Sequence, residues 1–111
     1  MKEKIVLLSS TELGNGEQKL GELIMANFLR LLPDQPNKPN KIICWNASVK
    51  LLTTDSQVLN QLKKIEAAGI EIIACRTCIE FFGIEDKIAV GKISTMQIIQ
   101  GLLLDNEVVT V

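Results

Sequence analysis

The 111-residue chain contains no histidine, no tyrosine, a single tryptophan and only three cysteines. The absence of histidine removes the usual general base, the Ser-His-Asp and Cys-His nucleophilic arrangements and most zinc sites. Twelve Lys+Arg against 13 Asp+Glu leave a net charge of -1, which excludes the basic excess of a nucleic-acid-binding surface. We therefore expect no nucleic-acid partner, no metal and no cofactor.

Long apolar runs are also missing. The N-terminal Met1–Lys4 is followed by only four apolar residues, Ile5 to Leu8. A secretory signal needs roughly 7–15 apolar residues, and a membrane span needs about 20. We expect a cytoplasmic protein without a membrane partner. Cysteines normally stay reduced in that compartment, so a close pair indicates redox or metal chemistry before a structural disulfide.

Hydrophobic residues make up 47% of the chain, and its length suits one domain over residues 1–111. All three prolines lie within residues 33–40. Proline cannot continue a helix, so this stretch is expected to be a surface loop after one.

Short continuous apolar runs predict strands that are buried on both faces. They cover residues 5–8, 42–45, 70–74 and 108–111, with a short extra strand expected near residues 88–90.

Helical stripes at three- and four-residue spacing separate these runs, and we expect them to face the core. They comprise Leu20, Leu23, Ile24, Phe28 and Leu31; Val58, Leu62 and Ile65; and Ile98, Ile99, Leu102 and Leu103. Capping boxes are expected at Thr54–Gln57 and Ser94–Gln97, and Gly69 suits the position after a helix end.

Strands that alternate with helices indicate βαβ units. We predict an α/β fold with three α/β/α layers and a mainly parallel sheet of four or five strands. Ligands of such sheets bind at the carboxyl ends of the strands. The loops of interest are therefore residues 9–16, 46–50 and 75–83.

The segment Cys75-Arg76-Thr77-Cys78 directly follows the third predicted strand. A cysteine between a strand end and a helix start faces free main-chain N–H groups, which favour the nucleophilic thiolate over the thiol. Arg76 adds a cation, and the C-x-x-C spacing lets two sulfurs meet. The alternative is that both cysteines are small buried residues. A structural zinc site lacks ligands, because only Cys44, expected in the core, remains.

Two polar loops complete the candidate site. Residues 9–16 join a strand to a helix and suit an anion, or simply form a flexible turn. Residues 46–50 offer hydrogen-bond donors, or form an ordinary strand-to-helix cap with Lys50 in solvent. The residues that we expect to bind an anion or stabilise a thiolate are Arg76, Thr77, Ser10, Gly14, Gly16, Asn46 and Ser48.

Four segments in this order resemble the DsrE-like family of small sulfur-relay proteins, above all the DsrE-like domain of YedF-type selenium-metabolism proteins. They are Leu8–Gly16, Asn46–Leu51, Ala74–Ile84 and Val90–Met96. The resemblance implies a five-stranded parallel α/β/α domain that forms homo-oligomers. It also implies that sulfur is carried as a persulfide on the cysteine after the third strand, which here is Cys75, with Cys78 as the second cysteine of the subgroup.

The chain departs from the subgroup in two ways. Arg76 stands where a small residue is usual, and the N-terminal TusA-like domain of YedF-type proteins is absent from the 111 residues. We therefore expect the sulfur donor and acceptor to be separate proteins.

The function expected from these features is that of a sulfur carrier or sulfurtransferase, with a persulfide on Cys75. The resemblance supports sulfur handling better than any particular enzymatic reaction. Two alternatives stay open: a thiol-disulfide switch through Cys75 and Cys78, and a non-catalytic oligomeric module that binds a small ligand.

Overall fold

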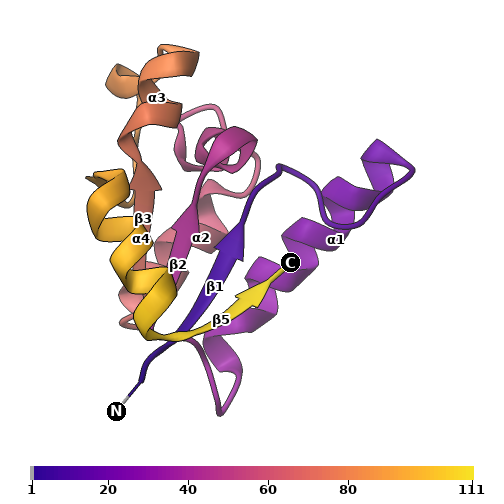
Figure 1. Ribbon diagram of the computed structural model, residues 1–111. Helices are drawn as coiled ribbons and strands as arrows, with labels where there is room; N and C mark the ends of the chain where they lie inside the picture. Colours follow the sequence, from indigo (N-terminus) through magenta and orange to yellow (C-terminus); the bar gives the residue numbers. More distant parts are fainter. Residues whose placement is uncertain (1) are drawn as a thin grey trace.

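The computed structural model describes residues 2–111, and Met1 lies outside the described residues. Five strands form one sheet in the order β4-β3-β2-β1-β5, and every neighbouring pair is parallel (Figure 1). The strands are β1 (Lys4–Leu8), β2 (Lys41–Cys44), β3 (Glu71–Cys75), β4 (Lys92–Ser94) and β5 (Glu107–Thr110).

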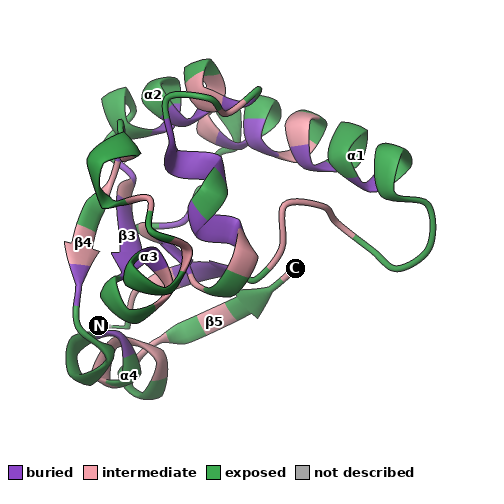
Figure 2. Cartoon of the chain, turned by 90° about the horizontal axis from the view of Figure 1, so that it is seen from above, coloured by how far each residue is buried: buried purple, intermediate pink, exposed green. Residues whose placement is uncertain are grey.

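Four α-helices connect the strands: α1 (Gln18–Leu31), α2 (Leu59–Ala67), α3 (Arg76–Phe82) and α4 (Met96–Asp105). Figure 2 shows α1 and α2 on one face of the sheet and α4 on the other. The short α3 follows β3 at the carboxyl edge of the sheet, beside the 3-10 segment η2 (Asn46–Leu52). The predicted α/β class with three layers is confirmed. None of the helices within residues 2–111 is long and apolar enough to cross a membrane.

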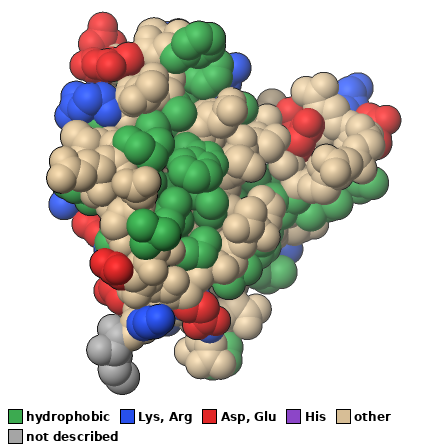
Figure 3. Space-filling model, in the orientation of Figure 1, with side chains coloured by type: hydrophobic (Ala, Val, Ile, Leu, Met, Phe, Trp, Pro, Cys, Tyr) green, Lys and Arg blue, Asp and Glu red, His purple; other side chains and the backbone are tan. Residues whose placement is uncertain are grey.

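The two faces of the sheet bury different amounts of apolar surface. On the α1 and α2 side, a large cluster includes Val6, Leu8, Ile42 and Cys44. On the α4 side a smaller cluster is built around Ile99, because only one ten-residue helix covers that face. Figure 3 shows hydrophobic side chains gathered on the α4 side of the molecule. Large apolar residues of α4 that remain exposed are Met96, Ile98 and Leu104.

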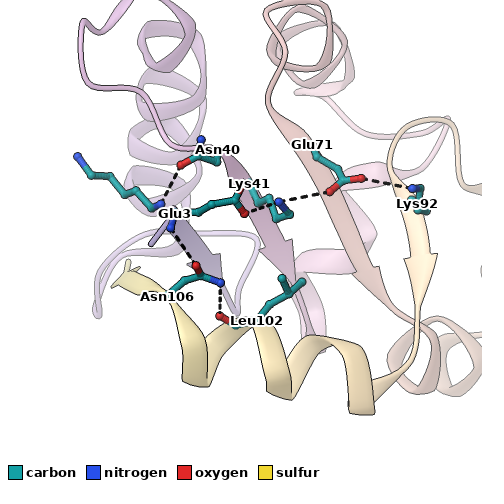
Figure 4. A network of polar contacts seen from close by, with 8 residues as sticks. Glu3, Asn40, Lys41, Glu71, Lys92, Leu102 and Asn106 are labelled. Carbon is teal, nitrogen blue, oxygen red and sulfur yellow. Dashed lines mark hydrogen bonds and ion pairs between the residues drawn. The ribbon is translucent and has the colours of Figure 1, made fainter. Parts of the chain in front are cut away.

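Alternating charges run across the amino ends of the strands (Figure 4). The Lys41 ammonium lies 2.5 Å from the Glu3 carboxylate and 3.8 Å from that of Glu71. Glu71 also contacts Lys92 on the edge strand at 3.3 Å. These pairs link the residue before β1 to β2, β3 and β4, although exposed ion pairs stabilise a fold by only about 0–1 kcal/mol each. These ion pairs lie at the amino edge of the sheet, opposite the carboxyl ends of the strands.

The predicted core-facing stripe of α1 is wrong. Its members Leu20, Leu23, Ile24 and Leu31 are exposed, and only Phe28 is partly buried. The helix instead buries Gly21, Met25 and Leu29. Gly21 explains the choice of face, since a Cβ there would lie 2.8 Å from Cβ of Glu12 in the preceding loop. The absent side chain lets that loop pack directly on the helix.

Three local expectations need correction. The extra strand lies at residues 92–94, while Ile88 makes only an isolated antiparallel bridge to Thr53. Helix α2 begins after Val58 without a side-chain cap, so the Thr54–Gln57 box does not form. The cap of α4 is Thr95, whose hydroxyl accepts the N–H of Ile98 at 3.4 Å, one residue after the predicted Ser94.

Other local predictions are confirmed. Gly69 follows the end of α2 with a φ of +91°, a conformation that glycine adopts without strain. Val58, Leu62 and Ile65 all face the core, and Cys44 is fully buried within it.

Candidate active site

Cys75 and Cys78 lie at the carboxyl edge of the sheet. Cys75 is the last residue of β3 and caps α3 with an extended backbone, and Cys78 follows in the first turn of the helix. All three cysteines are free thiols. The Cys75 side chain is fully buried in the cluster on the α4 side. Cys78 is partly exposed and packs against both hydrophobic clusters, so it is the more accessible of the two cysteines.

The sulfur of Cys78 accepts a hydrogen bond from the main chain of another loop. The donor is the N–H of Asn46, and the nitrogen lies 3.0 Å from Sγ. Asn46 has a φ of +53° and is the only non-glycine residue within residues 2–111 with a positive φ. Asparagine tolerates this left-handed conformation better than most residues. The turn that begins η2 therefore brings a main-chain donor to Cys78.

Ser48 holds this turn in place from inside the protein. Its fully buried hydroxyl lies 2.6 Å from the carbonyl oxygen of Leu8 and 2.7 Å from that of Trp45. The Trp45 N–H donates to the same Leu8 oxygen at 3.2 Å. These bonds tie the start of η2 to the end of β1. The hydroxyl of Ser48 is thus engaged with main-chain oxygens.

Burial has the largest effect on the pKa of two thiols, those of Cys78 and Cys44. The pKa of Cys78 is raised above its ordinary value, because burial outweighs the hydrogen bond from Asn46 and the neighbouring Cys75 also raises it. The pKa of Cys44 is raised to about 12 by complete burial, against a smaller lowering by Ser48. For Cys78 the start of a helix is therefore not enough to favour the thiolate. Cys44, which points into the core, has no access to a substrate.

The remaining predicted residues do not gather at the thiols. Arg76 and Thr77 are exposed on α3, and no hydrogen bond or ion pair within the described chain joins them to either sulfur. Ser10 accepts the N–H of Glu12 in a local turn. Figures 1 and 2 show that the loop after β1 extends along α1, away from α3. The structure thus brings Asn46 to Cys78 and leaves Ser10, Gly14 and Gly16 in the separate loop.

Lys50 links η2 to α3 through a contact that sequence reasoning missed. Its ammonium lies 4.3 Å from the centre of the Phe82 ring, a cation–π geometry. No sequence motif marks such a contact, because the two residues are far apart in the chain. Lys50 also borders a cleft of about 590 Å³ between η2, α1 and the segment before α2. The other lining residues include Thr11, Lys19, Glu22, Met25, Leu51, Gln57 and Val58.

The part of the chain that the structure describes contains no cluster of side chains that could bind a metal ion. No group of three or more Cys, Asp or Glu side chains within residues 2–111 lies close enough together to hold an ion. The arrangement that the site does offer is a pair of thiols, a main-chain donor on one sulfur and an exposed helix beside them.

Comparison with known proteins places the fold among solved structures. No family model matches the sequence, and no curated protein matches it. The crystal structure of the ychN protein from E. coli has a TM-score of 0.75 and 15% identity, with complete coverage of both chains. MTH1491, a protein of unknown function from Methanobacterium thermoautotrophicum, has a TM-score of 0.66 and 14% identity, covering 98% of this chain and 99% of its own.

A third structure extends the likeness. BT1422, a conserved protein of unknown function from Bacteroides thetaiotaomicron, has a TM-score of 0.66 and 23% identity, covering 98% of this chain and 95% of its own. At these identities the likeness concerns the fold over the full length of the chain.

Proposed function

We propose that this protein receives sulfane sulfur as a cysteine persulfide within the Cys75–Cys78 pair and passes it to a thiol acceptor. The observation that carries the proposal is the pair itself: two free thiols three residues apart, one on the N-cap residue of α3 and one in its first turn, where it is partly exposed and bonded to a main-chain N–H. The sequence resemblance to DsrE-like proteins supports the same chemistry, with Cys75 as its expected carrier. Donor and acceptor are separate cytoplasmic proteins in this proposal.

The transfer needs no histidine, because a thiolate is its own nucleophile. A thiolate of the pair attacks the terminal sulfur of a donor persulfide, R–S–SH. A new S–S bond forms on the protein, the donor S–S bond breaks, and R–S⁻ leaves with the electron pair. An acceptor thiolate then attacks the terminal sulfur, taking it as a persulfide and restoring the cysteine thiolate.

Intact-mass analysis after incubation with sodium polysulfide tests the proposal. We expect the wild type to gain sulfur and the double variant Cys75→Ser/Cys78→Ser, which keeps Cys44, to gain none. Cys44→Ala serves as the matched control and should load as the wild type does, since Cys44 is fully buried. Absence of sulfur on the wild type, or equal gain by the double variant, would refute the proposal.

A thiol-disulfide switch is the second candidate, favoured by the three-residue spacing of the two free thiols at the start of α3. It predicts a Cys75–Cys78 couple within the range of cellular thiol potentials, measured by titration in glutathione buffers. A couple that stays reduced across the whole range would remove this candidate.

Self-association is part of the proposal. Copies of this chain are proposed to associate, as the resemblance implies. The exposed apolar residues on the α4 side support this, because apolar groups without a partner in the chain favour burial against another surface. Ile98 and Leu104, both on α4, are members of that exposed set.

A further inference from the structure

We infer that Cys78 takes the sulfur first and that the main-chain amide of Asn46 is the group that positions it, with Cys75 acting afterwards as the resolving thiol. This inference rests on the proposed persulfide function and reverses the roles that the sequence resemblance implies. It specifies which of the two cysteine sulfurs reacts with the persulfide donor.

Access separates the two sulfurs. The Cys75 side chain is 0% exposed and surrounded by the cluster that includes Ile73 and Ile99. A donor persulfide cannot approach that sulfur unless the local structure opens. Cys78 is partly exposed at the border of both clusters, so its sulfur has a solvent side in the folded protein. The first attack on an external donor therefore belongs to Cys78.

A main-chain hydrogen-bond donor that is held in place also distinguishes Cys78 from Cys75. The Asn46 N–H contacts Cys78 Sγ at 3.0 Å, and a hydrogen bond to an ionised acceptor is about twice as strong as one to a neutral acceptor. The donor is held by the left-handed turn at Asn46 and by the buried hydroxyl of Ser48. An N–H that is already oriented needs little rearrangement when charge develops on sulfur. It stabilises the thiolate before attack and the same sulfur when it leaves during transfer.

The steps balance without another reagent. The Cys78 thiolate attacks the terminal sulfur of R–S–SH, forming Cys78–S–SH and releasing R–S⁻. If no acceptor arrives, the Cys75 thiolate attacks Sγ of Cys78, forming the Cys75–Cys78 disulfide and releasing HS⁻. Residues three apart in a helical turn are neighbours, which makes this second attack intramolecular. The sulfane sulfur is reduced to sulfide, and the two cysteine sulfurs are oxidised to the disulfide.

Single cysteine variants test the order of attack. After exposure to sodium polysulfide, Cys75→Ser is expected to keep one added sulfur on Cys78, because its resolving thiol is gone. Cys78→Ser is expected to load at least about tenfold more slowly, since its remaining site thiol is buried. The wild type should gain sulfur and then convert to a chain with a disulfide while sulfide appears in solution. Brief iodoacetamide labelling of the wild type, read by peptide mapping, should modify Cys78 ahead of Cys75.

Two substitutions at Asn46 test the amide. Asn46→Gly keeps the N–H and adopts a positive φ freely, so it is the reference with which Asn46→Val is compared. Asn46→Val also keeps an N–H, but a β-branched residue strongly disfavours that φ, so the donor should turn away. We expect about tenfold slower loading in Asn46→Val and a shift of its Cys78 alkylation profile to higher pH. A merely structural role would not shift that profile, and circular dichroism checks that both variants fold.

The possible outcomes separate this inference from the proposed function. Sulfur that loads on Cys78→Ser but not on Cys75→Ser, or iodoacetamide that labels Cys75 first, overturns the order of attack and leaves the sulfur function standing. Equal alkylation profiles in Asn46→Val and Asn46→Gly overturn the role of the amide. A wild type that gains no sulfur refutes the proposed function and this inference together.

Discussion

Replacing Ser48 with alanine removes the hydroxyl that ties the start of η2 to the end of β1. The hydroxyl lies close to two carbonyl oxygens, those of Leu8 and Trp45, but it has one hydrogen to donate. The Leu8 oxygen also accepts the Trp45 N–H at 3.2 Å, so it retains a donor in the variant. The loss therefore amounts to one buried hydrogen bond, about 1–2 kcal/mol of the free energy of unfolding.

Urea denaturation followed by far-UV circular dichroism measures this loss. With a denaturant slope of about 1–3 kcal/mol/M, we expect the unfolding midpoint of Ser48→Ala to fall by roughly 0.3–2 M. Ser9→Ala is the matched control, because Ser9 is exposed and a surface change of this kind stays within about 0.5 kcal/mol. A midpoint for Ser48→Ala no lower than that of Ser9→Ala would refute the role assigned to the buried hydroxyl.

Three further predictions concern other parts of the molecule. Because burial and Cys75 raise the pKa of Cys78, its alkylation rate by iodoacetamide should still increase above pH 9.0, and Cys75→Ala should move the profile to lower pH; a plateau below pH 9.0 in the wild type would contradict this. Gly21→Ala should lower the urea midpoint by the equivalent of about 1–3 kcal/mol, despite alanine's better helix propensity, since the new Cβ would lie 2.8 Å from that of Glu12; an unchanged midpoint would show that the loop moves freely. Leu104→Glu should change the free energy of unfolding by no more than about 0.5 kcal/mol, because the side chain is 76% exposed. The variant should also self-associate less than the wild type in sedimentation velocity, and a monomeric wild type would rule out the proposed association.

The sheet was predictable because its central strands carry continuous apolar runs. Ile5, Ile42 and Ile72 are buried on strands with neighbours on both sides, and such strands need no polar face. The edge strand β4 lacked that mark, since Lys92 is exposed and Ile93 only partly buried. The extra strand was predicted near residues 88–90 instead, where Val90 is apolar and buried but lies outside a strand.

The face of α1 was not predictable from periodicity, because two adjacent stripes of this helix are apolar. The stripe with larger side chains at Leu20 and Leu23 has the stronger pattern. The stripe through Gly21 and Met25 packs inward because the glycine lets a loop approach closely, and that depends on tertiary structure.

The candidate site was partly predictable. The position of Cys75 and Cys78 after a buried strand follows from the order of elements along the chain. The contact between Asn46 and Cys78 spans 32 residues and depends on the sign of one backbone dihedral, which no side-chain pattern encodes. Ser48 was expected to face a ligand, yet its hydroxyl satisfies main-chain oxygens.

Trp45 is partly buried in the same cluster as Cys75 and Cys78. The chain has one tryptophan and no tyrosine, so light that phenylalanine does not absorb excites this indole alone. Disulfide sulfur is an effective quencher of a nearby indole. The protein thus contains an intrinsic fluorophore in the cluster that holds both thiols of the candidate site, and we expect its emission to fall when a Cys75–Cys78 disulfide forms.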